Sequence, residues 1–224
     1  MNKYIILSEK EWHKNLFNSL QNKNEGIWLL LDTIEKFNLK SLKEFNPSKI
    51  FIPHWSYIIP NEIYKNFECI VFHMTDLPFG RGGSPLQNLI EKGFKTTKIS
   101  AIKVEKGLDT GDVYLKRELS LNGTAREIFE KSSTIIQEMI NEIIAKNIQP
   151  VKQVGNITKF KRRKPEDSNI DGLYDLEKVY DYIRMLDCDE YPHAFLETSN
   201  LKFEFINAEF NNYDKMITAN VRIF

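Results

Sequence analysis

Two stretches of sequence decide the fold, FHMTDLPFGRGGSP at residues 72–85 and GLDTGD at residues 107–112. The first follows a short apolar run that predicts a buried strand, which would deliver His73 to the carboxyl edge of a sheet, where α/β proteins bind ligands. The second follows residues that alternate like a strand, and Gly107 allows a tight turn that could aim Asp109 back at His73. A carboxylate beside an imidazole orients it, which suits proton transfer.

Apolar runs alternate with amphipathic segments over the first two thirds of the chain. The pattern predicts strands at residues 4–7, 26–31, 50–53, 69–72, 96–104 and 112–119, and helices at residues 9–21, 33–45, 85–92 and 125–146. Such alternation favours a mostly parallel sheet with right-handed crossovers. The first turn carries no glycine-rich dinucleotide motif, so nothing there indicates NAD or ATP.

The composition changes after Pro150, which predicts a catalytic domain at residues 1–150 and a small α+β appendage at residues 151–224. A basic run at residues 159–164 is expected to open the appendage, with a solvated linker as the alternative. A helix over residues 175–186 and strands near residues 202–206 and 217–223 complete the prediction.

The charge balance gives no sign of a general nucleic-acid binder. The chain has 31 Lys and Arg against 31 Asp and Glu, and residues 151–224 have 11 against 13. The two cysteines, Cys69 and Cys188, lie far apart without metal-ligand spacing, which fits reduced thiols in the cytoplasm. Charge within the first ten residues argues against a signal peptide or a membrane span.

The two stretches together resemble a known family. HMTDLPFGRGGSP at residues 73–85 resembles the His-Pro-Ser-Leu-Leu-Pro-x-x-Arg-Gly-x-x-Pro segment of formyltransferases that use 10-formyltetrahydrofolate, and GLDTGD resembles their Asp-x-Gly turn. The resemblance extends over residues 50–145. It implies an α/β, Rossmann-like formyltransferase core, 10-formyltetrahydrofolate as co-substrate and no metal.

The resemblance also implies roles for individual residues. His73 would bond the developing oxyanion or protonate the leaving nitrogen, and Asp109 would support it and help to remove the amine proton. The implied cofactor-binding residues are Tyr57, Ile58, Ile59, Thr75, Asp76, Leu77, Arg81, Glu105, Gly107 and Leu108. For residues 54–60 an ordinary aromatic loop is the alternative, and for Asp76 a helix N-cap.

The sequence departs from the family at Val71, where the family has an asparagine that helps to hold the formyl oxygen. Loss of one oxyanion donor typically costs on the order of 10²–10³ in rate. Another polar side chain is therefore expected to take this catalytic role. Asn88 is the first candidate and Thr75 the second.

The tail carries a further resemblance. RKPEDSNID at residues 163–171 and YPHAF at residues 191–195 resemble the region after the catalytic domain of nucleotide-sugar N-formyltransferases, such as those of the pseudaminic acid and aminoarabinose pathways. The implied acceptor is a nucleotide-linked amino sugar, with no nucleic-acid or membrane partner and a homodimer as a possible assembly. The alternatives are methionyl-tRNA formyltransferase and a degenerate homologue that binds folate or a nucleotide sugar without catalysis.

Overall fold

The chain forms two compact units in the computed structural model, which describes all 224 residues. Unit 1 comprises Met1–Gly82, Lys98–Leu119 and Glu130–Lys159, and unit 2 comprises Gly83–Thr97, Ser120–Phe129 and Phe160–Phe224. The chain passes between the units more than once, so packing rather than chain order defines them. The division into domains at residue 150 stays a prediction.

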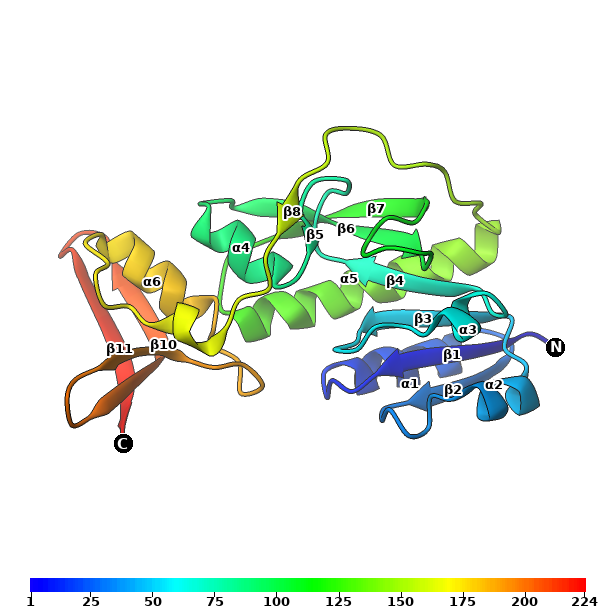
Figure 1. Cartoon of the computed structure of the whole chain (residues 1–224), viewed down its shortest axis with the longest axis horizontal. Coiled ribbons are helices and arrows are strands. Elements are labelled where there is room, and N and C mark those ends of the chain that lie inside the picture. Colours follow the sequence, from blue (N-terminus) through cyan, green and yellow to red (C-terminus); the bar gives the residue numbers. More distant parts are fainter. The chain divides into compact units, whose positions relative to one another are not determined.

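A six-stranded sheet runs through unit 1 in the order β2-β1-β3-β4-β6-β7 (Figure 1). Its strands are β1 (Lys3–Ser8), β2 (Ile27–Leu31), β3 (Lys49–His54), β4 (Cys69–His73), β6 (Thr96–Lys103) and β7 (Val113–Ser120). The pairs β1–β2, β1–β3 and β3–β4 are parallel, whereas β6 is antiparallel to β4. The mostly parallel α/β sheet predicted from the sequence is confirmed.

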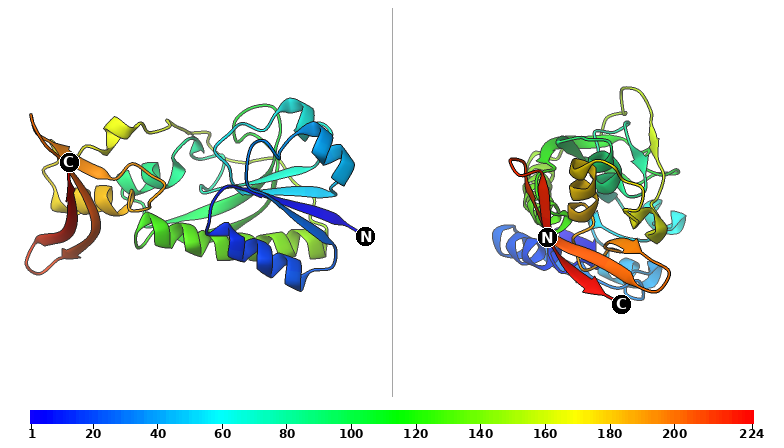
Figure 2. Two further views of the ribbon diagram at one scale, coloured as in Figure 1. Left: turned by 90° about the horizontal axis from the view of Figure 1, so that it is seen from below. Right: turned by 90° about the vertical axis from the view of Figure 1, so that its left-hand side faces the viewer.

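Helices cover both faces of this sheet (Figure 2). Helix α1 (His13–Lys23) lies beside α5 (Ala125–Lys146), where Asn24 Nδ2 donates to Asn141 Oδ1 at 3.0 Å. The short helices α2 (Leu39–Phe45) and α3 (Asn61–Tyr64) lie on the other face. The helix predicted over residues 33–45 begins only at Leu39, because Asn38 is extended and its side chain caps the helix by accepting from Ser41 N at 3.0 Å.

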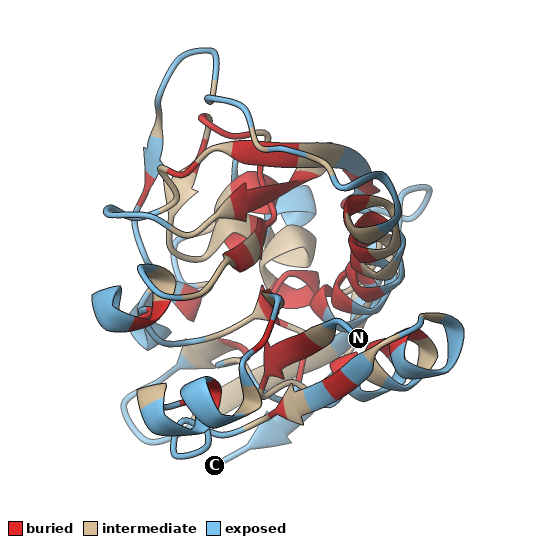
Figure 3. Ribbon diagram, turned by 90° about the vertical axis from the view of Figure 1, so that its right-hand side faces the viewer, coloured by how far each residue is buried: buried red, intermediate tan, exposed pale blue.

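The central strands are buried (Figure 3). Ile5, Phe51 and Ile70, one from each of β1, β3 and β4, are fully buried, as expected for parallel strands covered on both faces. Because these three strands are parallel, their carboxyl ends share one edge of the sheet. Ser8, His54 and His73 are the last residues of the three strands and lie at that edge.

The turn after β1 is closed by a buried polar pair. Ser8 Oγ lies 2.7 Å from His13 Nδ1, and Lys10 N donates to the same hydroxyl at 3.2 Å. Burial, helped by the charges of His54 and Lys10, lowers the pKa of His13 to about 3. The imidazole of His13 is therefore neutral at pH 7 and can accept the hydroxyl hydrogen of Ser8.

Unit 2 contains a three-stranded antiparallel sheet in the order β11-β10-β9, with β9 (Ala194–Glu197), β10 (Lys202–Asn211) and β11 (Met216–Ile223). Helix α6 (Leu176–Arg184) packs on β10, where the rings of Tyr180 and Phe210 stack at 5.8 Å. Unit 2 also holds α4 (Pro85–Glu91) and a 3₁₀ turn at Pro165–Ser168. The predicted α+β appendage is thereby confirmed.

A two-stranded sheet completes the fold. It pairs β5 (Arg81–Gly82) with β8 (Lys159–Phe160). None of the helices has the combination of length and apolar character needed to cross a bilayer.

Candidate active site

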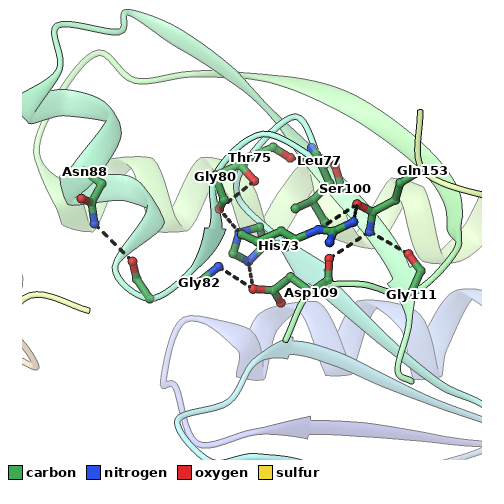
Figure 4. Close-up of polar contacts among 12 residues, drawn as sticks. His73, Thr75, Leu77, Gly80, Gly82, Asn88, Ser100, Asp109, Gly111 and Gln153 are labelled. Atoms are coloured by element: carbon green, nitrogen blue, oxygen red, sulfur yellow. Dashed lines mark hydrogen bonds and ion pairs between the residues drawn. The ribbon is translucent and has the colours of Figure 1, made fainter. Parts of the chain in front are cut away.

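His73 ends β4 and is 8% exposed. Its Nδ1 faces Asp109 Oδ2 at 3.6 Å, and its Nε2 lies 2.8 Å from Gly80 O (Figure 4). A carbonyl oxygen can only accept, so Nε2 carries the hydrogen in this contact. The imidazole is thus held between a carboxylate on one side and a backbone carbonyl on the other.

Asp109 stands in a turn that few residue types can form. Its own φ is +53° and that of Gly107 is +106°, both in the left-handed region. Its Oδ2 accepts from Gly82 N at 2.9 Å and is the same oxygen that faces His73. The structure brings the two side chains together, and their catalytic roles stay predictions.

Thr75 and Leu77 shape the loop that follows His73. Ser100 Oγ donates to Thr75 O at 2.7 Å and accepts from Leu77 N at 3.3 Å. Both Thr75 and Leu77 are fully buried, and Thr75 Oγ1 donates to Gly80 O at 3.4 Å. The hydroxyl of Thr75 therefore shares the carbonyl acceptor that His73 Nε2 uses. In this structure Thr75 and Leu77 hold the loop, and cofactor contacts for them stay predictions.

Asp76 is half-exposed and pairs with two lysines. Its Oδ2 accepts from Lys98 Nζ at 2.9 Å and its Oδ1 from Lys116 Nζ at 2.5 Å. Partial burial alone would raise the pKa of Asp76, but the hydrogen bonds from Lys116 and Lys98 outweigh it and hold that pKa below its ordinary value. These contacts anchor the loop to β6 and β7.

Replacing Asp76 by asparagine is expected to change how stability depends on pH. A lowered pKa means that ionised Asp76 stabilises the fold above its unfolded-state pKa of about 3.9, and that this contribution disappears as the pH falls through the lowered value. The free energies of unfolding of wild type and Asp76→Asn, measured in urea from neutral to acid pH, should therefore converge at low pH. The difference at neutral pH should be below ~1 kcal/mol, because the pair is half-exposed. A difference that stays constant with pH would contradict the ion-pair role.

The loops at residues 57–59 and 105–108 present apolar side chains to solvent. Tyr57 is 51% exposed, Ile58 87% and Leu108 63%, whereas Ile59 is buried in the apolar cluster with Ile52. Glu105 follows β6, and its Oε1 lies 3.5 Å from Lys103 Nζ. Leu108 stands directly before Asp109, and the cofactor contacts predicted for Tyr57, Ile58, Ile59, Glu105, Gly107 and Leu108 stay predictions.

Asn88, the predicted replacement for the family asparagine, belongs to unit 2. Its Nδ2 donates to Gly83 O at 3.2 Å, to Ser84 O at 2.9 Å and to Lys161 O at 3.0 Å. It also lines a pocket of about 290 Å³ together with Glu91, Lys161, Arg162, Arg163, Asp167 and Tyr182. The amide hydrogens of Asn88 are engaged with backbone carbonyls, so an oxyanion role would require their exchange and stays a prediction.

Sequence reasoning missed Gln153. Its Oε1 accepts from Arg81 Nη2 at 2.8 Å and from Arg81 Nε at 3.2 Å, and its Nε2 donates to Asp109 O at 2.9 Å and to Gly111 O at 2.8 Å. Gln153 lies in an irregular segment after α5, and no motif or periodicity marks it. Only the tertiary structure shows that it meets both glycine-rich turns.

The structure gathers no group of three or more His, Cys, Asp or Glu side chains that could hold a metal ion. The two cysteines are free and buried, and burial, with the charge of Glu68 adding, raises the pKa of Cys69 to about 12.

Comparison with known proteins matches the chain to two family models. Residues 31–134 match "Formyl transferase", and residues 165–224 match "Methionyl-tRNA formyltransferase, C-terminal domain". A methionyl-tRNA formyltransferase from Thermodesulfovibrio yellowstonii is 31% identical over 176 residues, which cover 73% of this chain and 56% of that protein. The match thus spans less than two thirds of that relative's length.

Solved structures extend the comparison. A methionyl-tRNA formyltransferase from Clostridium thermocellum is 48% identical with a TM-score of 0.97, covering 100% of this chain and 99% of that one. HypX from Aquifex aeolicus, solved in complex with tetrahydrofolic acid, has a TM-score of 0.76 at 18% identity, covering 93% of this chain and 38% of HypX. The HypX likeness shows a shared fold.

These findings correct two expectations from the sequence. The nucleotide-sugar N-formyltransferase subtype is wrong, because the relatives at 31% and 48% identity are both named methionyl-tRNA formyltransferase. The expected nucleotide-sugar partner and the exclusion of nucleic acid are wrong for the same reason, since those relatives are named for a tRNA.

The family-level expectation is confirmed at both ends of the chain. The N-terminal match contains the two stretches that carry His73 and Asp109, and the C-terminal match covers the last 60 residues. The Clostridium structure adds nearly complete coverage of both chains. The chain belongs to the formyltransferase family and has the methionyl-tRNA formyltransferase fold.

Proposed function

We propose that this chain transfers the formyl group of 10-formyltetrahydrofolate to the amino group of methionyl-tRNA. The observation that carries the proposal is the 48% identity with the Clostridium methionyl-tRNA formyltransferase over essentially both whole chains. The His73–Asp109 pair supports it, because it supplies a proton-transfer group at the sheet edge where ligands bind.

When bound, the co-substrate supplies the formyl group: a C–N bond to the acceptor amine forms, the bond to N10 breaks, and one proton moves from the amine to N10. His73 Nε2 is the atom that can give or take this proton, once a substrate atom replaces Gly80 O as its partner. Asp109 keeps Nδ1 directed at Oδ2 and stabilises positive charge on the ring. Gly82 N in turn fixes the Asp109 carboxylate.

The exposed apolar side chains suit the folate. We assign Tyr57, Ile58 and Leu108 to contact its ring system, because they are the exposed large apolar members of the predicted cofactor set. Arg81 already donates to Gln153 through Nε and Nη2, so its remaining guanidinium hydrogens are the ones that can meet an anionic ligand group. A cytoplasmic location and a homodimer stay predictions.

Release of tetrahydrofolate from 10-formyltetrahydrofolate tests the proposal. We expect release in the presence of methionyl-tRNA, with formylmethionine recovered after deacylation, and none with uncharged tRNA. Free methionine is the third arm and should be a far poorer acceptor. Binding of the tRNA should weaken as salt rises, because phosphate contacts release counterions. No turnover with methionyl-tRNA by the folded wild type would contradict the proposal, and turnover would exclude the non-catalytic alternative.

A further inference from the structure

The two turns of the candidate site are joined by one side chain from a distant part of the chain. Gln153 lies in unit 1, and its amide bridges Arg81, in the first turn, and the carbonyls of Asp109 and Gly111, in the second (Figure 4). All four hydrogen bonds lie between 2.8 and 3.2 Å, so both ends of the amide are fully used.

The backbone around Gln153 is itself fixed on both sides. Val151 forms an antiparallel bridge with Val113 through bonds of 2.7 and 2.9 Å. Farther along, Thr158 O accepts from Arg81 N at 3.0 Å and Thr158 Oγ1 accepts from Gly80 N at 2.7 Å. The segment from Val151 to Thr158 is thus tied to the start of β7 at one end and to the loop after His73 at the other.

The second turn, to which Gln153 donates both of its amide hydrogens, has unfavourable backbone geometry at Asp109. Asp109 is not a glycine but has a φ of +53°, a strained conformation that persists only where the surrounding structure imposes it. The Gln153 amide bonds the carbonyl of Asp109 and that of Gly111, the residue two positions on. The first bond fixes the peptide plane that follows the Asp109 Cα, and the second fixes the end of the turn.

We propose that Gln153 is a positioning residue that holds Asp109 in reach of His73. It makes no hydrogen bond to the imidazole or to the Asp109 carboxylate, so it acts through the backbone of the turn. Arg81 directly precedes Gly82, whose N–H binds the Asp109 carboxylate at 2.9 Å. The same glutamine therefore aligns both the turn that carries the carboxylate and the loop that anchors it.

The test uses the full chain, two replacements of similar size and one control. Gln153→Met keeps the volume but makes no hydrogen bonds, and Gln153→Glu keeps an acceptor for Arg81 but loses the hydrogens given to the two carbonyls. Gln149→Ala is the matched control, because Gln149 is exposed and its amide donates only to Asn147 O, at 3.1 Å. The kinetic measurement rests on the proposed function, and the spectroscopic measurement does not.

In the kinetic arm, we expect both Gln153 variants to lower kcat about 10- to 30-fold, with KM for 10-formyltetrahydrofolate within about 3-fold of wild type. The control should match wild type. A positioning role that runs through Arg81 alone would leave Gln153→Glu near wild-type kcat, and that result would overturn the proposal. An increase in KM for 10-formyltetrahydrofolate without a loss of kcat would also overturn the proposal. It would indicate that Gln153 stabilises the bound substrate and the transition state equally.

The position of Asp109 relative to His73 can also be tested by NMR, without any substrate. In protein with ¹⁵N-labelled histidine, the chain has four imidazoles, and the His73 signals are assigned by their loss in His73→Asn. We expect the His73 ring signals to move in Gln153→Met in the same direction as in Asp109→Asn. If they stay at wild-type positions in folded Gln153→Met while Asp109→Asn moves them, Gln153 does not position Asp109. If the wild type is inactive with methionyl-tRNA but the His73 signals move in Gln153→Met as expected, only the proposed function is contradicted.

Discussion

Replacing His73 by asparagine is expected to lower kcat for formyl transfer about 10²- to 10⁴-fold, the range that general acid–base catalysis contributes. Asparagine can still donate to Gly80 O, so the loop after β4 keeps its shape. It cannot take up and release a proton near neutral pH. Single-turnover measurement of tetrahydrofolate release tests this chemical step directly.

Replacing Asp109 by asparagine should cause a loss of the same order. The amide oxygen can still accept from Gly82 N, which lies 2.9 Å from the native carboxylate, but the charge that faces His73 is removed. Because the two side chains act as a unit, the double variant should be little slower than either single variant. Losses that multiply in the double variant would show that the two residues act independently.

His193→Asn is the control for both variants. His193 is a buried histidine of unit 2, and its Nδ1 lies 3.3 Å from Leu186 O. The same exchange there should leave the rate of the chemical step unchanged, provided that the protein is folded. A similar loss in His193→Asn would mean that histidine replacement lowers activity through general instability.

The sequence was sufficient for the sheet because its central strands are parallel and buried. Ile5, Phe51 and Ile70 stand in continuous apolar runs, which local pattern reveals without any long-range contact. The same locality explains why His73 and Asp109 could be paired: His73 ends one strand, and Asp109 lies in the turn after another. Local pattern could not reveal Gln153, which stands 44 residues after Asp109. It reaches Asp109 because its segment is bonded to Val113 at one end and to Gly80 and Arg81 at the other.

The sugar-transferase expectation was wrong because the tail motif behind it is built from structural residues. Within RKPED, Pro165 starts the 3₁₀ turn, Asp167 Oδ2 accepts from Lys164 N at 2.7 Å, and Arg163 binds Glu91 at 2.7 Å. Within YPHAF, Tyr191 stacks on Phe129 with ring centres 5.4 Å apart, and Ala194 is buried at the start of β9. Such contacts belong to the fold, so they do not report which acceptor is bound.

The hydrogen-bond partners of Asn88 could not be predicted from the sequence either. A sequence reveals that an amide is available one turn into a helix, but not that three backbone carbonyls already engage it. Helix α4 starts at Pro85 without a side-chain cap from Ser84, and Asn88 bonds Ser84 O instead. Its partners come from a loop and from Lys161, which stands 73 positions away, and no local pattern links them.

Gly111→Ala is expected to lower the free energy of unfolding by about 3 kcal/mol. A Cβ at this position would lie 1.7 Å from Lys103 O and 2.8 Å from Lys103 C, which are backbone atoms of β6 and cannot rotate away. The overlap would push apart Lys103 N and Asp112 O, now bonded at 2.9 Å, and with them the base of the turn that carries Asp109.

The matched control is Gly93→Ala, because a Cβ at Gly93 meets no atom within 4 Å while its φ is +81°. Gly93→Ala is expected to lose only about 1 kcal/mol, for the left-handed backbone conformation. Gly111 has no positive φ, so the larger loss in Gly111→Ala comes from the overlap with Lys103 alone. Urea unfolding measures both, and kcat of the folded fraction should fall in Gly111→Ala alone, since only that turn carries the carboxylate facing His73. A Gly111→Ala protein as stable as wild type would mean that the β6–β7 turn yields without cost. The carboxylate would then owe its position to Gly82 and Gln153 rather than to the close packing of the turn on β6.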